Sequence, residues 1–288
     1  MMSENLKTKI ADFDRILNEA VDTHLDGKEL VGVVALFSGG NDSTILTHLA
    51  RQFLTHAAHA NTTIGSEHTR QFVRDVCSSW ELPLLEHKPP MTYREHVLLH
   101  GFPGPAMHYK MYQQLKERCL RSIRRELVQN GYRQRVLYVA GRRRAESSRR
   151  SNVVEHERID SVIWASPLAN WTKADMEEYR TWALETGDTV PVNPIAIAAG
   201  MSMECCCGAF AEPGEFDMIE RVDPAIAQEI VQLEADARAA GVPAQKCRWG
   251  WGAYRDDPDS QPIKTGAMCS SCDARWDRTS PTVHEKEA

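Results

Sequence analysis

The chain has 288 residues, of which 42% are hydrophobic and 26% are charged, and its formal net charge is −6. This composition is typical of a globular protein that forms one large domain, or one domain and a smaller module. It excludes a surface that is basic throughout, and no apolar run approaches the roughly 20 residues of a membrane span.

The N-terminal residues show no secretory apolar region, so we expect a cytoplasmic protein without membrane contact. Eight cysteines in such a chain are expected to be reduced, and to bind metal or act in catalysis rather than form disulfides.

Apolar residues recur at helical spacing over residues 5–26, and we assign residues 1–28 to an N-terminal helix. Apolar runs then predict strands at 31–37, 57–62, 82–86, 136–140 and 163–166, with helices at 43–55, 67–80, 107–129 and 173–185. Strands that alternate with helices indicate an α/β fold with a doubly wound parallel sheet, which we place at residues 29–189.

The composition changes after this region. Residues 188–214 are rich in Pro, Gly, Ala, Cys and Met, and we predict a smaller cysteine-rich, metal-binding module over 190–278. A helix is expected at 224–240, because Pro suits its first turn and Gly241 suits the position after its end. Residues 279–288 read as a flexible polar tail.

The turn between the first strand and the next helix, residues 38–43, reads Ser-Gly-Gly-Asn-Asp-Ser. Two glycines let the backbone approach a phosphate, and the amides of the first helical turn then point at the anion. The serines add hydroxyl donors, and the aspartate can hold Mg²⁺. We therefore predict a nucleotide phosphate site, with a plain βα turn as the alternative. Its residues are Ser38, Gly39, Gly40, Asn41, Asp42 and Ser43, of which Asp42 and Ser43 are the predicted catalytic residues.

A second candidate is the basic loop after the strand at 136–140. Five arginines fall between residues 142 and 150, and arginine forks match phosphate or sulfate oxygens in pairs. The carboxyl ends of parallel strands meet at one edge of a sheet, so both loops are expected to face one cleft. A solvated loop and a nucleic-acid backbone site are the alternatives. We assign Gly141, Arg142, Arg149 and Arg150 to phosphate contacts, and Glu146 to orienting the arginines.

Thr62 and Gly65 follow the second strand and are candidates to hold the ribose or the adenine. The alternative is an ordinary turn at this position.

Six cysteines follow residue 200, and the Cys269-Ser-Ser-Cys272 spacing lets two thiolates bind one metal. Four thiolates suit either tetrahedral zinc or a [4Fe–4S] cluster. Alternate residues of an extended chain point the same way, so Cys205 can share a site with Cys207. The predicted ligands are Cys207, Cys247, Cys269 and Cys272, with Cys205 as a further candidate. The alternatives are a zinc site that only holds a loop-rich module together, and free thiols.

Several blocks resemble, in the same order, the phosphoadenosine phosphosulfate (PAPS) reductase family of the PP-loop ATP pyrophosphatase superfamily. Residues 38–43 resemble its SGGxDS signature, and residues 59–72 resemble its NTGI…ETREF stretch. Residues 141–150 and 166–175 resemble its GxRxxES…R and PLxxWtxxDV stretches. Residues 204–215 resemble the ECxCGAF…PGE block of phage and bacterial relatives, which implies iron–sulfur in preference to zinc.

The resemblance implies an adenine nucleotide alpha hydrolase-like fold that binds ATP or a sulfonucleotide at 38–43. It further implies ATP-dependent adenylation with release of pyrophosphate, coupled to sulfur transfer onto a nucleic-acid or nucleotide acceptor. A cysteine desulfurase as sulfur donor, or a reductant protein, is the implied partner, and a homodimer is among the expected assemblies.

Two other functions are compatible with the same blocks. Reduction of phosphoadenylyl or adenylyl sulfate is one, but no cysteine follows Cys272 to match the ECGLH-type tail of such reductases. A non-catalytic nucleotide-binding protein is the other, although the intact Ser-Gly-Gly-Asn-Asp-Ser turn argues against a degenerate site.

Overall fold

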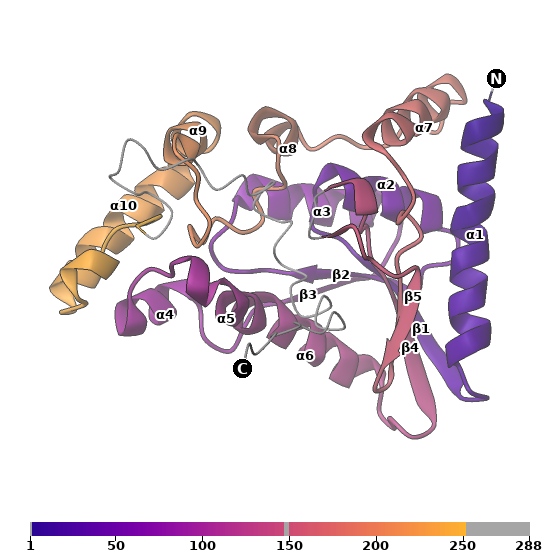
Figure 1. Ribbon diagram of the computed structural model, residues 1–288, viewed down its shortest axis with the longest axis horizontal. Coiled ribbons are helices and arrows are strands. Elements are labelled where there is room, and N and C mark those ends of the chain that lie inside the picture. The colour runs from indigo at the N-terminus through magenta and orange to yellow at the C-terminus, as the bar shows by residue number, and fades with distance from the viewer. Residues whose placement is uncertain (1, 147–149, 252–288) are drawn as a thin grey trace, which may run out of the picture.

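The computed structural model describes residues 2–146 and 150–251. Its centre is a six-stranded sheet with the order β3-β2-β1-β4-β6-β5 (Figure 1). The strands are β1 (Glu29–Leu36), β2 (His56–Ala60), β3 (Leu84–His87), β4 (Gln134–Val139), β5 (His156–Ile159) and β6 (Val162–Ala165). All neighbouring strands are parallel except β5, which pairs antiparallel with β6. The predicted α/β fold is confirmed, while the four-residue strand β5 was not predicted.

Helices cover both faces of the sheet, as expected of a doubly wound fold (Figure 1). On one face lie α1 (Glu4–His24), α2 (Asn41–Ala50), α3 (Glu67–Ser79) and α7 (Lys173–Glu185). On the other face α6 (Arg118–Leu127) buries Ile123 against Val136 and Tyr138 of β4. Strand residues alternate between the faces, so Leu137 and Val139 of β4 join the core under α1 instead.

The helix predicted over 107–129 is divided. A 3₁₀ turn at Pro105–Met107 leads into α5 (His108–Tyr112). A separate helix that was not predicted, α4 (Tyr93–His100), precedes this turn. A π-helical turn, Gln113–Glu117, then joins α5 to α6. Such wide turns are rare and often occur at functional sites, and this one carries Lys116 to the cavity described below.

The chain after α7 forms α8 (Pro194–Ala199), α9 (Glu215–Val222) and α10 (Pro224–Ala239). Only α10 was predicted. The described part of the predicted cysteine module, residues 190–251, does not build a core alone. Its cysteines and Trp249 pack with Tyr93, Phe102 and Met111 from the α4–α5 region.

Cys269, Cys272 and the predicted tail lie outside the described residues. Within the part of the chain that the structure describes, no helix combines the length and the apolar character needed to cross a membrane.

Backbone hydrogen bonds join the turn after β2 to the cysteine segment. Ser66 N donates to Met203 O at 2.7 Å, and Cys206 N donates to Ile64 O at 2.6 Å. The two backbones approach so closely at Gly65 that a Cβ there would lie 2.1 Å from Glu204 O. This contact requires glycine, because neither partner is a flexible side chain.

We expect Gly65→Ala to lower the free energy of unfolding by about 1–3 kcal/mol, since the added methyl group must push two backbones apart. Gly131→Ala is the matched control, because its nearest neighbour is the end of the Arg124 side chain at 3.0 Å. Chemical denaturation measures both variants. Equal stability of Gly65→Ala and the wild type would show that the two backbones are not held together at this point.

Glu215, the first residue of α9, is a buried carboxyl. Its Oε2 accepts a hydrogen bond from Glu212 N at 2.9 Å, while its Oε1 has no hydrogen-bond partner among the described residues. Burial raises its pKa from 4.5 to about 7, and the hydrogen bond from Glu212 N only partly opposes this effect. The folded protein therefore holds the Glu215 proton more tightly than the unfolded chain does.

Because the folded pKa is the higher one, this group stabilises the fold fully below pH 4.5, and the contribution is lost as the pH rises through about 7. Glu215→Gln cannot ionise, so we expect its stability relative to the wild type to improve by up to about 3 kcal/mol between those pH values. Denaturant unfolding across this pH range measures the difference. A difference that does not change with pH would contradict the assignment.

Candidate nucleotide site

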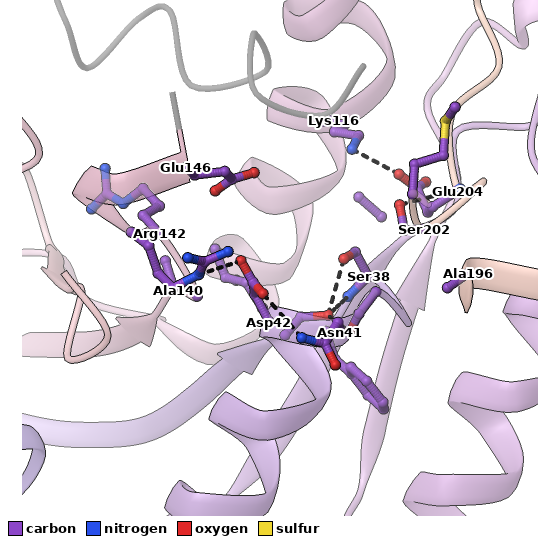
Figure 2. A pocket seen from close by; sticks show the side chains of 18 of the residues that line it. Ser38, Asn41, Asp42, Lys116, Ala140, Arg142, Glu146, Ala196, Ser202 and Glu204 are labelled. Carbon is purple, nitrogen blue, oxygen red and sulfur yellow. Dashed lines mark hydrogen bonds and ion pairs between the residues drawn. The ribbon is translucent and has the colours of Figure 1, made fainter. Parts of the chain in front are cut away.

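A cavity of about 440 Å³ opens where β1, β2 and β4 reach their carboxyl ends. Figure 2 shows its three walls: Ser38, Asn41 and Asp42 on one, Arg142 and Glu146 on another, and Lys116 with Ser202 and Glu204 on the third. Five cationic and three acidic side chains line the described cavity, which therefore favours an anionic ligand.

The first wall is the turn that opens α2. Ser43 Oγ lies 3.0 Å from Ser38 Oγ and donates to Gly40 O at 3.1 Å, which closes the turn on itself. Gly40 is the N-cap residue, and no side chain in the described ranges caps the amides of this first helical turn. Gly39 has a φ of +75°, which glycine adopts without strain. The free amides of α2 thus lie at the cavity, where the helix dipole favours negative charge.

Asp42 faces the cavity and is held from two sides (Figure 2). Its Oδ2 accepts a hydrogen bond from Arg143 Nε at 2.7 Å, and its Oδ1 accepts one from Asn41 Nδ2 at 3.4 Å. The contact to Arg143 joins the turn after β1 to the loop after β4, although 101 residues separate them. The predicted convergence of the two loops is therefore present.

Arg142 forms the second wall with the side chains that surround it. Its Nε donates to Ser166 Oγ at 2.9 Å, and its guanidinium lies 5.6 Å from the centre of the Trp164 ring. Arg142 is 5% exposed, and its Nη2 has no hydrogen-bond partner among the described residues. A buried donor without a partner is costly, so this atom is suited to an anionic ligand. Arg150 pairs with Glu146 at the same wall.

The third wall carries an ion pair that the sequence did not indicate. Lys116 Nζ lies 2.7 Å from Glu204 Oε2, and both side chains are largely buried. Glu204 is fixed from behind, because Thr62 Oγ1 donates to its carbonyl oxygen at 2.6 Å and Thr62 N donates to its Oε1 at 3.3 Å.

Asn193 supports the turn of 38–43 from outside the cavity. Its Nδ2 donates to Gly39 O at 2.9 Å and to Thr69 Oγ1 at 3.1 Å. Thr69 in turn donates to Ser202 O at 2.8 Å. These contacts fix the segment at 190–204 against the turn, and that segment contributes Ala196 and Ser202 to the cavity lining.

The structure brings most of the predicted nucleotide residues around the cavity: Ser38, Gly40, Asn41, Asp42, Ser43, Gly141, Arg142, Glu146 and Arg150. Gly39 lies behind the turn, against Thr69. Arg149 lies outside the described residues. Thr62 and Gly65 are not part of the lining and instead hold the backbone of Glu204, so their contact with a nucleotide stays a prediction.

Sequence reasoning missed Lys116, Lys173 and Glu204, which line the cavity, and Arg180 and Asn193, which support the turn from outside it. None of these belongs to a local pattern, and only the Asn-Pro step after Asn193 marks a turn. Arg143 lies in the basic run, but its spacing could not show which arginine contacts Asp42.

The predicted metal ligands are only partly described. Cys205 and Cys207 lie side by side, and the contact between their thiols and burial raise the pKa of Cys205. Cys247 lies in the same hydrophobic core, and its thiol contacts Val242 O at 3.2 Å. Among the described residues, however, no three His, Cys, Asp or Glu side chains are grouped to hold a metal ion. These residues do not fit a cluster or zinc by themselves, since Cys269 and Cys272 lie outside the described range.

Residues 32–197, more than half of the chain, match the family model of the phosphoadenosine phosphosulfate reductase domain. The chain belongs to this family. The match includes the turn at 38–43 and the arginine loop, so the family identity confirms a PP-loop nucleotide-binding fold of a family of enzymes. It does not extend over the six cysteines that follow residue 200.

Solved structures of three nucleotide enzymes are similar to this chain. A Candida auris PAPS reductase is 16% identical, with a TM-score of 0.43 over 68% of this chain and 92% of that one. A Candida glabrata FMN adenylyltransferase is 12% identical, with a TM-score of 0.46 over 68% of this chain and 60% of that one. A Francisella tularensis NMN synthetase is 12% identical, with a TM-score of 0.41 over 88% of this chain and 99% of that one. These likenesses carry no argument about activity. The search of curated proteins returned no match.

Arg142→Met should weaken the binding of inorganic pyrophosphate by about 10- to 100-fold, because it removes a buried cation that lacks one hydrogen-bond partner. Arg124→Met is the matched control, since Arg124 Nε also donates to a serine hydroxyl, Ser161 Oγ at 2.7 Å, but lies outside the cavity lining. Isothermal titration calorimetry measures both. Equal losses in the two variants would show that Arg142 does not contact the anion.

Proposed function

We propose that the chain binds ATP in this cavity, with the terminal phosphates at the turn of 38–43, and adenylates an acceptor with release of pyrophosphate. The observation that carries the proposal is the uncapped first turn of α2, which lies at a cavity with an excess of cationic side chains. A helix N-terminus beside arginines is suited to a polyanion rather than to a neutral ligand.

The rest of the cavity suits an adenine ring. Apolar side chains of Leu36, Leu120 and Trp164 line it beside the small residues Ala58 and Ala60. These small side chains leave room above β2, and ligand pockets are commonly about 300–1,000 Å³ in volume. A base in this apolar part and phosphates at the turn would together use the length of the cavity.

In the proposed reaction, an acceptor oxygen attacks the α-phosphorus of ATP. A bond forms between that oxygen and phosphorus, and the bond from phosphorus to the pyrophosphate oxygen breaks. The amides of α2 and the Arg142 guanidinium would stabilise the charge that develops on the leaving pyrophosphate. Asp42 is the carboxylate at the turn that would hold Mg²⁺, which supplies charge neutralisation at the phosphates when bound.

We further propose that a sulfur nucleophile at the oxidation level of hydrosulfide then displaces AMP from the acceptor. A carbon–sulfur bond forms as the carbon–oxygen bond to AMP breaks, so the step needs no oxidant or reductant. A nucleic-acid or nucleotide acceptor and a cysteine desulfurase as donor are part of this proposal. It is supported by the place of Cys205, which follows the cavity residue Glu204 directly in the chain.

Reduction of a sulfonucleotide is the second candidate, and membership of the PAPS reductase family favours it. The same anion site would then bind the phosphosulfate group. The two reactions differ in their products, because adenylation releases pyrophosphate from ATP whereas reduction releases sulfite.

The decisive comparison is pyrophosphate release from ATP beside sulfite release from adenylyl and phosphoadenylyl sulfate with a dithiol reductant. We expect ATP to bind, and nucleic acid to stimulate pyrophosphate release. Asp42→Asn should retain ATP binding within about tenfold but lose turnover by at least about a hundredfold, since it removes the carboxylate charge. Arg238→Met, at an exposed ion pair on α10, is the control.

Sulfite release without pyrophosphate release would contradict adenylation and support reduction of a sulfonucleotide. Nucleotide binding without either product, unchanged in Asp42→Asn, would favour a non-catalytic protein.

The proposed [4Fe–4S] cluster, or zinc in its place, has its own test. Anaerobically purified protein should contain about four irons and matching sulfide per chain, and absorb near 400 nm. Cys205→Ser and Cys207→Ser tell which thiol of the adjacent pair is a ligand. One zinc and no iron per chain would make the site structural. A protein that contains neither iron nor zinc would exclude the metal site from the proposal.

A further inference from the structure

Arg180 lies on α7 outside the cavity lining, and its side chain is half-buried beside the turn of 38–43. Its Nε donates to Asn41 Oδ1 at 2.9 Å. Its Nη1 donates to Val190 O at 3.3 Å and to Pro191 O at 3.2 Å. One side chain thus joins the phosphate turn to the start of the segment at 190–204 that forms another part of the cavity.

The contact with Arg180 determines how the Asn41 amide is oriented. A guanidinium only donates hydrogen bonds, so the oxygen of Asn41 must face Arg180. The Asn41 amino group then turns the other way, where its Nδ2 donates to Asp42 Oδ1 at 3.4 Å. Arg143 donates to the second oxygen of the same carboxylate at 2.7 Å. Asp42 is therefore held between two donors, and one of them depends on Arg180.

We propose that Arg180 is a positioning residue that fixes the Asn41 amide and, through it, the Asp42 carboxylate for a Mg²⁺–nucleotide. The inference rests on the proposed function, because it gives Asp42 the metal-holding task. Arg180 itself touches neither phosphate nor metal. Burial lowers the pKa of its guanidinium and Asp42 acts in the opposite direction, but arginine stays charged in proteins.

A purely structural role gives a different expectation. If Arg180 only holds residues 190–191, its loss would loosen the cavity and lower the affinity for ATP equally with and without Mg²⁺. A role through Asn41 and Asp42 instead weakens only the part of the affinity that Mg²⁺ adds. It also makes the effects of Arg180 and Asn41 overlap, because both act on one carboxylate.

The experiment is a double-mutant cycle with Arg180→Met, Asn41→Ala and the double variant, titrated calorimetrically with ATP in Mg²⁺ and in EDTA. We expect each single variant to lose about tenfold of the Mg²⁺-dependent affinity, and Arg180→Met, which changes no residue of the lining, to keep the affinity in EDTA within about threefold. The double variant should lose no more than either single one. Arg180→Lys should recover part of the loss, and Arg238→Met should match the wild type.

Additive losses in the double variant, equal losses with and without Mg²⁺, or no loss would each overturn the inference. If Arg180→Met does not fold by circular dichroism, the comparison of Arg180→Lys with Asn41→Ala decides in the same way. If the wild type does not bind ATP, the proposed function fails first and the inference falls with it. If the wild type binds ATP and Arg180→Met binds it with the same affinity, the inference is refuted while the proposed function stands.

Discussion

The first turn of α2 follows the N-cap residue Gly40, and no side chain among residues 2–146 and 150–251 caps its amide groups. Helix N-termini need acceptors for these groups, and protein side chains commonly provide them. The chain does so elsewhere, since Thr92 and Thr172 cap α4 and α7 through their own hydroxyls. At the turn that faces the cavity, the described part of the chain provides no such acceptor, so these amides are available to a ligand. The loop after β4 and the segment at 190–204 contact the turn of 38–43 and line the same cavity.

The acidic side chains of the cavity do not oppose the binding of an anion at the first turn of α2. Asp42, Glu146 and Glu204 each form an ion pair with a cation of the lining, so none presents an uncompensated charge to a phosphate. Arg142 instead combines a weak approach to Glu157 at 3.8 Å with a stacked position over Trp164. The charge available to a ligand therefore comes mainly from the arginine loop and the helix. The family to which the chain belongs is one of nucleotide-binding enzymes, in agreement with this arrangement.

The same contacts connect the cavity to the cysteine segment. Residues 203–206 pair with the turn after β2, and Tyr93 Oη donates to Cys207 O at 2.7 Å from α4. Trp249 Nε1 donates to Cys206 O at 2.8 Å from the other side. The cysteines are thus fixed at the back of the wall that carries Glu204. A rigid connection of this kind suits chemistry that uses a nucleotide and a thiol in one site.

Local sequence patterns were sufficient to predict candidate sites that consist of consecutive residues. The turn at 38–43 and the loop at 141–150 are each contiguous in sequence, so their residue types were sufficient to predict an anion site, and the structure places both loops at one cavity. The thiols of Cys205 and Cys207 are in contact, while a metal site that they share stays a prediction. Lys116 and Glu204 meet because a π-helical turn and a segment distant in sequence line the same cavity. Arg180 and Asn193 act through single long-range hydrogen bonds, which leave no periodic signal. The short strand β5 is specified by its pairing with β6 rather than by its own apolar content.

The most direct test of the central claim is a crystal structure of the protein with a non-hydrolysable ATP analogue and Mg²⁺. The account predicts the terminal phosphates within hydrogen-bond distance of the amides at 40–43, with Arg142 Nη2 on a phosphate oxygen and the base beside Ala58 and Trp164. A nucleotide bound elsewhere, or one whose phosphates point away from the N-terminus of α2, would contradict it.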